Sequence, residues 1–317
     1  MCAKVFGESV LIESKIINLD KNKETSIFKN EVVITTQDNS KITSEYAEYD
    51  RVNGVIKLKE NIKAIDNKNN IIESESAIYY ENTKVFKSFG PTKIITSDQY
   101  VIDGSDITFD NQKKFISSSN KALVTDLDNN KIYLDNFEYI VENNIFKSVG
   151  YVKIEDELNN TYEFSQVYID TKKKEILGTD IKAYLNHEDF KVDKKNKPRI
   201  FANNVKINKE KSSFKKSVFT MCDYREKDKC PPWSVKAKEM LHDSKNKTIF
   251  YKNAVVKVYD VPIFFFPKLS HPDPTVKRRS GFLIPTFSDT KNLGSGISVP
   301  YFWALNDDKN LTLTSKL

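Results

Sequence analysis

The chain has 317 residues, a formal net charge of +6, 39% hydrophobic residues and 30% charged residues. This polar composition argues against one large core and favours many short strands that are each half exposed to solvent. The positive charge is spread along the chain, which argues against a nucleic-acid partner. Met1-Cys2-Ala3-Lys4 lacks the features of a signal peptide, and the sequence has no run of about 18 apolar residues, as a membrane helix would need.

A thirty-residue repeat organises the first 190 or so residues. One apolar column reads Ile17, Ala47, Ala77, Ile107, Phe137, Val167. The column two residues further on reads Leu19, Tyr49, Tyr79, Phe109, Tyr139, Ile169, and a later one reads Ser26, Ile56, Phe86, Ile116, Phe146, Ile176. Such a period predicts stacked units, none of which can bury its apolar face alone.

Within each repeat the apolar residues alternate with a period of two, which predicts strands. Asn53-Gly54 is a strong hairpin signal, and residues 110–113 supply turn chemistry in a later repeat. Early in each repeat the apolar column is even-numbered, as at Ile42, Ile72 and Ile102. Five residues later in the same repeat the apolar column is odd-numbered, as at Ala47, Ala77 and Ile107. This change of phase predicts a bulge or corner at the same place in every layer. The sequence therefore predicts an all-β fold of stacked, bent strands.

The inner columns mix large and small side chains, which allows two interpretations. The columns either form a filled core or line a groove that holds acyl chains. The candidate groove residues are Ala47, Tyr49, Ala77, Tyr79, Phe86, Ile107, Phe109, Ile116, Phe137, Tyr139, Phe146, Val167 and Ile169.

No catalytic constellation or cofactor motif is present, so we expect no enzyme activity and no cofactor. The enzyme alternative is a parallel β-helix lyase or hydrolase, which should carry clustered acids on adjacent layers. The aspartate column of Asp20, Asp50, Asp110 and Asp170 is interrupted by Tyr80 and Ile140, so we interpret these aspartates as turn formers.

Cys2, Cys222 and Cys230 are too few, with only scattered histidines, to predict a zinc site. Disulfide chemistry in an oxidising compartment and unreactive thiols both remain open. From Ser280 aromatic residues cluster as they do at the lipid border of membrane barrels, although an ordinary soluble hairpin is the alternative. Residues 311–317 alternate strictly and stop within a strand, so we expect the chain to be part of a longer protein.

Several stretches of the C-terminal third carry a family resemblance. They are residues 219–222, 230–237, 261–267 and 299–304 and, most specifically, His-Pro-Asp-Pro-Thr-Val-Lys-Arg-Arg-Ser-Gly-Phe-Leu-Ile-Pro at 271–285. This third resembles the outer-membrane lipopolysaccharide-assembly family LptD, also called OstA or the organic-solvent-tolerance family. The repeats are similar to the periplasmic domain of that family, and they also occur in its soluble relatives.

The resemblance implies three parts and a location. Residues 1–200 would form a periplasmic β-jellyroll, V-shaped in section, which takes lipopolysaccharide from an LptA-like bridge protein. Residues 201–279 would form a junction, and residues 280–317 the first strands of an outer-membrane β-barrel plugged by an LptE-like lipoprotein. The alternative is a soluble periplasmic bridge protein of the same repeat type, which would lack everything after residue 270.

The resemblance also implies roles for the junction residues. Cys222 matches a junction cysteine that pairs with a cysteine late in the barrel, Cys2 would stand in for an N-terminal cysteine, and a local Cys222–Cys230 bond is the alternative. Phe264, Phe265 and Phe266 would contact acyl chains where the groove meets the barrel. Lys277, Arg278 and Arg279 would contact headgroup phosphates, and a solvated turn is the alternative for this basic run.

Overall fold

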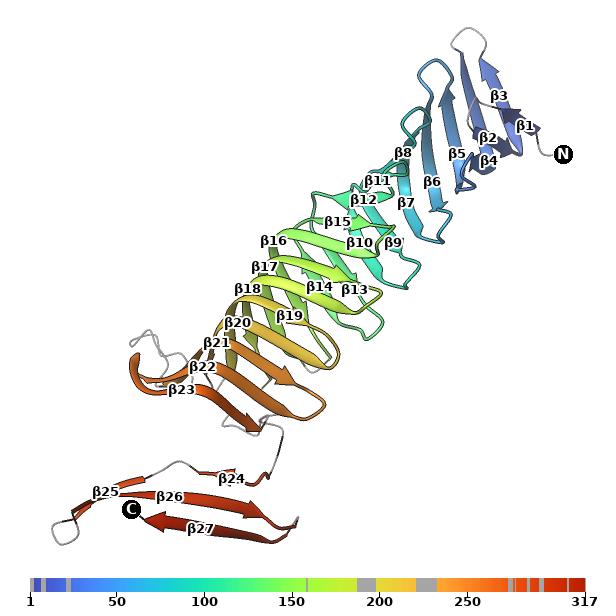
Figure 1. Cartoon of the computed structure of the whole chain (residues 1–317). Helices are drawn as coiled ribbons and strands as arrows, with labels where there is room; N and C mark the ends of the chain where they lie inside the picture. The colour runs from blue at the N-terminus through green and yellow to red at the C-terminus, as the bar shows by residue number, and fades with distance from the viewer. Residues whose placement is uncertain are drawn as a thin grey trace.

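The computed structural model describes residues 3–6, 10–20, 24–157, 159–186, 198–220, 233–272, 276, 278–283, 286–290, 294–306 and 308–316. Every regular element in these ranges is a strand, so the predicted all-β fold is confirmed. None of the described segments forms a helix long and apolar enough to cross a membrane. Figure 1 shows the strands stacked one after another from the N-terminal to the C-terminal end of the molecule.

A 23-stranded sheet contains most of the chain, and its paired strands run antiparallel. Its first strands are β1 (Ala3–Phe6), β2 (Val10–Ser14), β3 (Ile16–Asp20), β4 (Thr25–Thr36), β5 (Lys41–Asp50), β6 (Val55–Ile65) and β7 (Ile71–Tyr80). Short strands follow: β8 (Val85–Ser88), β9 (Pro91–Ile95), β10 (Val101–Ser105), β11 (Thr108–Asp110), β12 (Phe115–Ser118), β13 (Ala122–Thr125), β14 (Lys131–Leu134) and β15 (Phe137–Ile140). The last are β16 (Ile145–Glu155), β17 (Thr161–Asp170), β18 (Glu175–Tyr184), β19 (Arg199–Ile207), β20 (Lys211–Thr220), β21 (Trp233–Asp243), β22 (Thr248–Val258) and β23 (Val261–Pro272). This antiparallel pairing is not that of a parallel β-helix, so that alternative is wrong.

Each layer bends once, as the change of phase in the sequence predicts. The register shifts between Lys29 and Val32 in β4 and between Val149 and Val152 in β16. Gly90 and Gly150 have positive φ at this corner, which suits glycine because it has no Cβ to clash. The bend divides the sheet into two arms. Arm 1 carries the even-numbered column that includes Ile42 and Ile72. Arm 2 carries the two columns that include Ala47 and Tyr49.

Two rows of turns form the free ends of the arms. The row on arm 2, called rim 2, has a left-handed residue every thirty positions: Gly54, Lys84, Lys114, Asn144, Lys174. The row on arm 1, called rim 1, repeats in the same way: Asn39, Asn69, Gln99, Asn129, Asn159. Asp50, Asp110 and Asp170 accept backbone hydrogen bonds from the rim 2 turns, which confirms them as turn formers.

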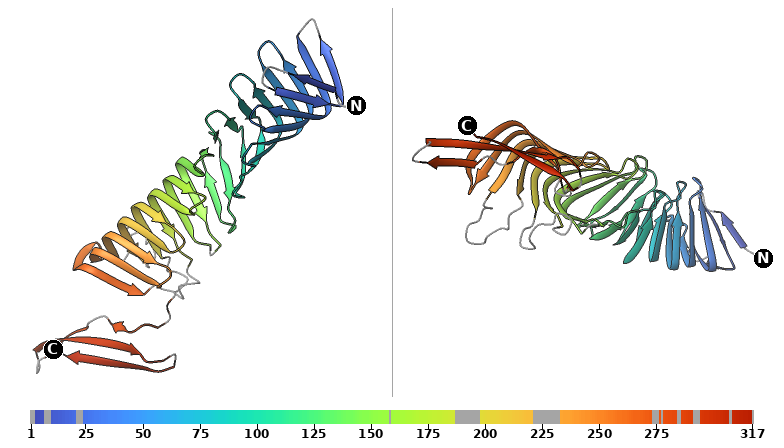
Figure 2. Two further views of the ribbon diagram at one scale, coloured as in Figure 1. Left: turned by 45° about the vertical axis from the view of Figure 1, so that its right-hand side comes forward. Right: turned by 90° about the horizontal axis from the view of Figure 1, so that it is seen from below.

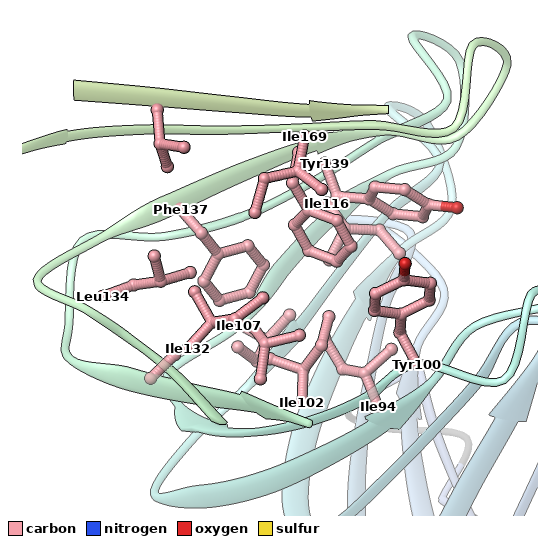
Figure 3. Packing of buried hydrophobic residues seen from close by; sticks show 14 of the residues in the cluster. Ile94, Tyr100, Ile102, Ile107, Ile116, Ile132, Leu134, Phe137, Tyr139 and Ile169 are labelled. Carbon is pink, nitrogen blue, oxygen red and sulfur yellow. The ribbon is translucent and has the colours of Figure 1, made fainter. Parts of the chain in front are cut away.

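Figure 2 shows the stack of bent strands in two further views. The hydrophobic core lies between the inner faces of the two arms, and Figure 3 shows part of it. Tyr139 stacks on Phe146 with ring centroids 4.4 Å apart, and Phe137 lies 6.3 Å from the same ring. Fully burying one such side chain stabilises the fold by about 1.5–3 kcal/mol. The core continues through β19 to β23, so the stacked sheet extends to Pro272. The division of the chain at residues 200 and 279 stays a prediction.

A second sheet of four antiparallel strands follows at the C-terminal end of the described chain (Figure 1). It contains β24 (Gly281–Phe282), β25 (Thr286–Thr290), β26 (Gly294–Ala304) and β27 (Asn310–Lys316). β26 pairs with β24 and β25 along one edge and with β27 along the other.

Candidate functional site

The interior between the arms contains every candidate groove residue. Each of these side chains is at most 6% exposed. Ile107, Phe137 and Tyr139 lie side by side in this interior in Figure 3. The structure therefore brings the candidates together as predicted, although they are buried against one another and do not line an open channel.

Packing across the interior is close. Two small cavities lie among the described side chains that line it, of about 20 Å³ beside Tyr79 and Phe109 and about 10 Å³ beside Tyr100 and Phe146. Each has room for about one water molecule. Phe164 of arm 1 packs directly over Gly178 of arm 2, where a side chain would collide with the ring. In this conformation the interior is a filled core, which was the first of the two interpretations.

Tyrosine hydroxyls mark the border between the apolar interior and the polar rims. The Tyr49 hydroxyl donates to Glu81 Oε2 at 2.7 Å, and the Tyr139 hydroxyl donates to Asn144 Oδ1 at 3.2 Å. Burial, together with nearby carboxylates, raises the pKa of Tyr79 and of Tyr100 to about 12. The interior is thus apolar in its depth and polar at its mouth, as an amphipathic ligand requires.

The C-terminal end of the interior exposes β23. Phe264 of β23 lies opposite Val256 of β22, and Val256 lies opposite Val235 of β21. Phe264 therefore continues the inner column of arm 1. Phe264 and Phe266 share this face, with ring centroids 6.2 Å apart. Phe265 alternates to the opposite face, so the predicted Phe trio is divided between two sides of the strand. Phe264 is 50% exposed and Phe265 is 60% exposed, because β23 is the last strand of this sheet.

A polar and aromatic cluster lies beside this end. Tyr251 Oη and His271 Nε2 are 2.9 Å apart, and the Phe219 ring lies 6.3 Å from the His271 ring. Burial raises the pKa of Tyr251. Phe219 belongs to arm 1 and His271 to arm 2, so the cluster joins the arms at the exit of the interior. The sequence did not single out this cluster, since its members come from three separated strands.

The basic run is only partly described. Arg279 Nη1 donates to Thr248 Oγ1 at 2.6 Å, which ties the segment after β23 to the turn before β22. Arg278 is half-buried. Lys277 and the disulfide candidates Cys2, Cys222 and Cys230 lie outside the described residues. Among the residues described, no group of His, Cys, Asp or Glu side chains could hold a metal ion.

One face of the second sheet is largely apolar. Trp303 lies opposite Leu311, and Tyr301 opposite Leu313, with Phe282 packed edge-on against Tyr301 at 5.1 Å. The alternate positions mix apolar and polar residues, for example Phe302 opposite Thr312. Phe282, Trp303 and Leu313 are 77%, 48% and 53% exposed. An apolar face that is exposed to this extent marks an interaction surface for lipid or protein.

A bent, stacked antiparallel sheet with an apolar interior, followed by strands with one apolar face, places the chain in the class of β-jellyroll repeat proteins. Residues 249–317 match the family described as LptD protein. The family resemblance of the C-terminal third is therefore confirmed: this part of the chain is similar to the LptD family.

Similar proteins match a part of the chain. The LPS-assembly protein LptD of Nitrosococcus oceani is 30% identical over 106 residues, which cover 33% of this chain and 14% of that protein. The LptD of Francisella tularensis subsp. novicida is 36% identical over 83 residues, which cover 26% of this chain and 9% of that protein. The LptD of Yersinia pestis bv. Antiqua is 38% identical over 82 residues, which cover 26% of this chain and 10% of that protein. The chain thus matches about a tenth of the length of these relatives.

A solved structure is also similar. It is LptH, the LptA homologous periplasmic component of the lipopolysaccharide transport device of Pseudomonas aeruginosa. Its sequence is 13% identical, with a TM-score of 0.16, over 54% of this chain and 81% of that chain.

Proposed function

We propose that the chain takes part in transporting lipopolysaccharide and inserting it into the outer leaflet of the outer membrane. The stacked sheet accepts acyl chains between its arms and passes them toward the second sheet. The observation that carries this proposal is the unbroken apolar interior, which runs to Phe264 and Phe266 at the last strand. Proteins similar to a part of this chain are named for LPS assembly, which supports the same ligand.

The role of the interior is to shield acyl chains from water. Each buried methylene is worth about 0.8 kcal/mol, so a lipid with several chains cannot cross an aqueous space unshielded. No catalytic step is needed, and the sheet supplies no energy. Further lipid molecules that arrive at the N-terminal end push the bound lipid forward and so set the direction of transport.

The second sheet begins a membrane β-barrel in this proposal. β26 has 11 residues, which suits a tilted strand that crosses a bilayer, and its aromatic residues Tyr301 and Trp303 share one face. The stacked sheet then lies in the periplasm, with an LptA-like bridge protein at its N-terminal edge and an LptE-like lipoprotein in the barrel. Arg278 and Arg279 lie between the sheets, where their charges suit headgroup phosphates.

Binding of labelled lipopolysaccharide to the purified chain in detergent tests the proposal. We expect saturable binding that is competed by unlabelled lipopolysaccharide but not by the polysaccharide after its acyl chains are removed. Competition by the deacylated polysaccharide would show that the sugar is recognised instead, and absence of binding would contradict the proposal.

A further inference from the structure

The two rims touch each other across the mouth of the interior. Asn111 Nδ2 donates to Asp38 Oδ2 at 2.7 Å, and Lys114 Nζ lies 3.4 Å from the same oxygen. Lys68 Nζ donates to the carbonyl oxygen of Val141 at 3.3 Å. These contacts join rim 1 to rim 2 directly, so they close the open side of the bent sheet.

The same connection recurs along the stack. The Thr171 hydroxyl donates to Asp98 Oδ2 at 2.9 Å, and Lys174 Nζ lies 3.2 Å from Asp128 Oδ2. The first three connections, made by Asp38, Lys68 and Asp98, each span 73 residues and start thirty residues apart. The row therefore follows the repeat, and it is called the clasp below.

The interior beneath the clasp has no room for an acyl chain in the described conformation. Its cavities of about 20 and 10 Å³ each hold about one water molecule. Loading therefore requires the arms to separate. If the arms separate in water, their apolar inner faces become exposed to solvent, which is unfavourable. If they separate around acyl chains, the inner faces exchange contacts with each other for contacts with lipid, so a lipid favours the open state.

The mouth is the side that can open. At the bend, the chain itself joins the two arms, within single strands such as β4 and β16, so the arms cannot separate there. At the mouth, every contact that the described residues make between the rims uses at least one side chain, and ion pairs of this partly exposed kind are individually weak. The bulges at the bend, with positive φ at Gly90 and Gly150, are the natural pivots.

We propose that the clasp is a closure device for lipid entry: the arms part along the rims, acyl chains enter the interior sideways, and the clasp re-forms over them. This inference rests on the proposed function. Entry by threading from one end of the stack is the competing route. The tyrosine hydroxyls beneath the clasp keep the polar part of the ligand at the rims.

Cross-linking across the mouth distinguishes the two routes. In a full chain whose native cysteines are replaced by serine, Asp38→Cys and Lys114→Cys are joined by a short bismaleimide. The matched control joins Asn53→Cys and Asn82→Cys, which lie on neighbouring turns of rim 2, where Asn82 Nδ2 donates to the carbonyl oxygen of Asn53 at 3.4 Å. Each linked protein is compared with its own unlinked form. The probe is fluorescently labelled lipopolysaccharide, and circular dichroism confirms that both proteins are folded.

We expect the link across the mouth to slow lipopolysaccharide association by at least about tenfold, since apparent affinity falls with the fraction of open molecules. The link along one rim should leave it unchanged. Equal association in both proteins would show end-on threading and would overturn the clasp. Absence of binding to the unlinked parent would instead contradict the proposed function.

A loosened variant tests the same claim without cross-links. Lys68→Met, Lys114→Met and Lys174→Met keep the aliphatic stems but remove the charged ends that reach across the mouth. We expect association to become about twofold faster or more, because the open fraction rises. An unchanged rate would show that the clasp does not control entry.

Discussion

Gly178→Ala measures how tightly the arms pack. A Cβ at this position would lie 2.6 Å from Phe164 Cε1, closer than real side chains approach. Phe164 is 3% exposed, so its ring cannot move to solvent without losing its contacts. Overpacking of this kind costs about 1–3 kcal/mol. Replacing glycine in a strand also stabilises by about 0.5–1 kcal/mol, so we expect a net loss of stability of up to about 2.5 kcal/mol.

Gly104→Ala is the matched control. Its Cβ would lie 3.5 Å from Ala122 Cβ and from Ile107 Cδ1, an ordinary contact, so we expect stability to be unchanged or slightly higher. Both variants are unfolded in urea and followed by circular dichroism.

Phe164→Leu provides a rescue for the same prediction. The smaller side chain leaves room for the new methyl group, so the cost of Gly178→Ala should shrink in the double variant, with a coupling of about 0.5–3 kcal/mol. If Gly178→Ala matches Gly104→Ala and shows no coupling, the arms do not pack against each other, and the filled interior is wrong.

Three further predictions concern the exit and the rims. Phe264→Asp should block transfer of lipopolysaccharide to the cell surface while the interior still loads, whereas Phe265→Asp on the other face should not; equal surface lipopolysaccharide would contradict this. Burial disfavours ionisation of Asp38, but hydrogen bonds from its neighbours and a nearby lysine hold its pKa well below 3.8. Its stabilisation is therefore fully present above pH 3.8 and declines as the pH falls toward the lowered pKa, so Asp38→Asn should reduce urea stability more at pH 7 than at pH 2. Because the pKa values of Tyr79 and Tyr100 rise from 10.0 to about 12, their stabilisation is present below pH 10 and lost between pH 10 and 12; Tyr100→Phe should weaken that alkaline loss.

The repeat made much of the fold predictable. Period-two alternation identified the strands, and the change of phase at Ile42 and Ile72 located the bend, because a bulge moves every later side chain to the other face. Asn53-Gly54 and the aspartates identified the turns of rim 2. These features are local, so one sequence contains enough information to locate them.

The rest depends on contacts between distant layers. The clasp joins turns 73 residues apart, and polar turn residues are common enough that nothing in their spacing alone indicated a contact. The fit of Phe164 over Gly178 depends on how far the two arms close, which side-chain type alone does not determine. The split of Phe264 from Phe265 follows from simple alternation and was overlooked because the three phenylalanines were considered as one group.

Site-specific photocrosslinking in cells tests most directly whether lipid occupies the interior. A diazirine side chain at Ile116 faces the interior, and the same group at Ser117 faces outward on the same strand, β12. We expect lipopolysaccharide adducts at position 116 and none at position 117. Equal labelling at both positions, or none at position 116 in cells that export lipopolysaccharide through this protein, would contradict transport between the arms.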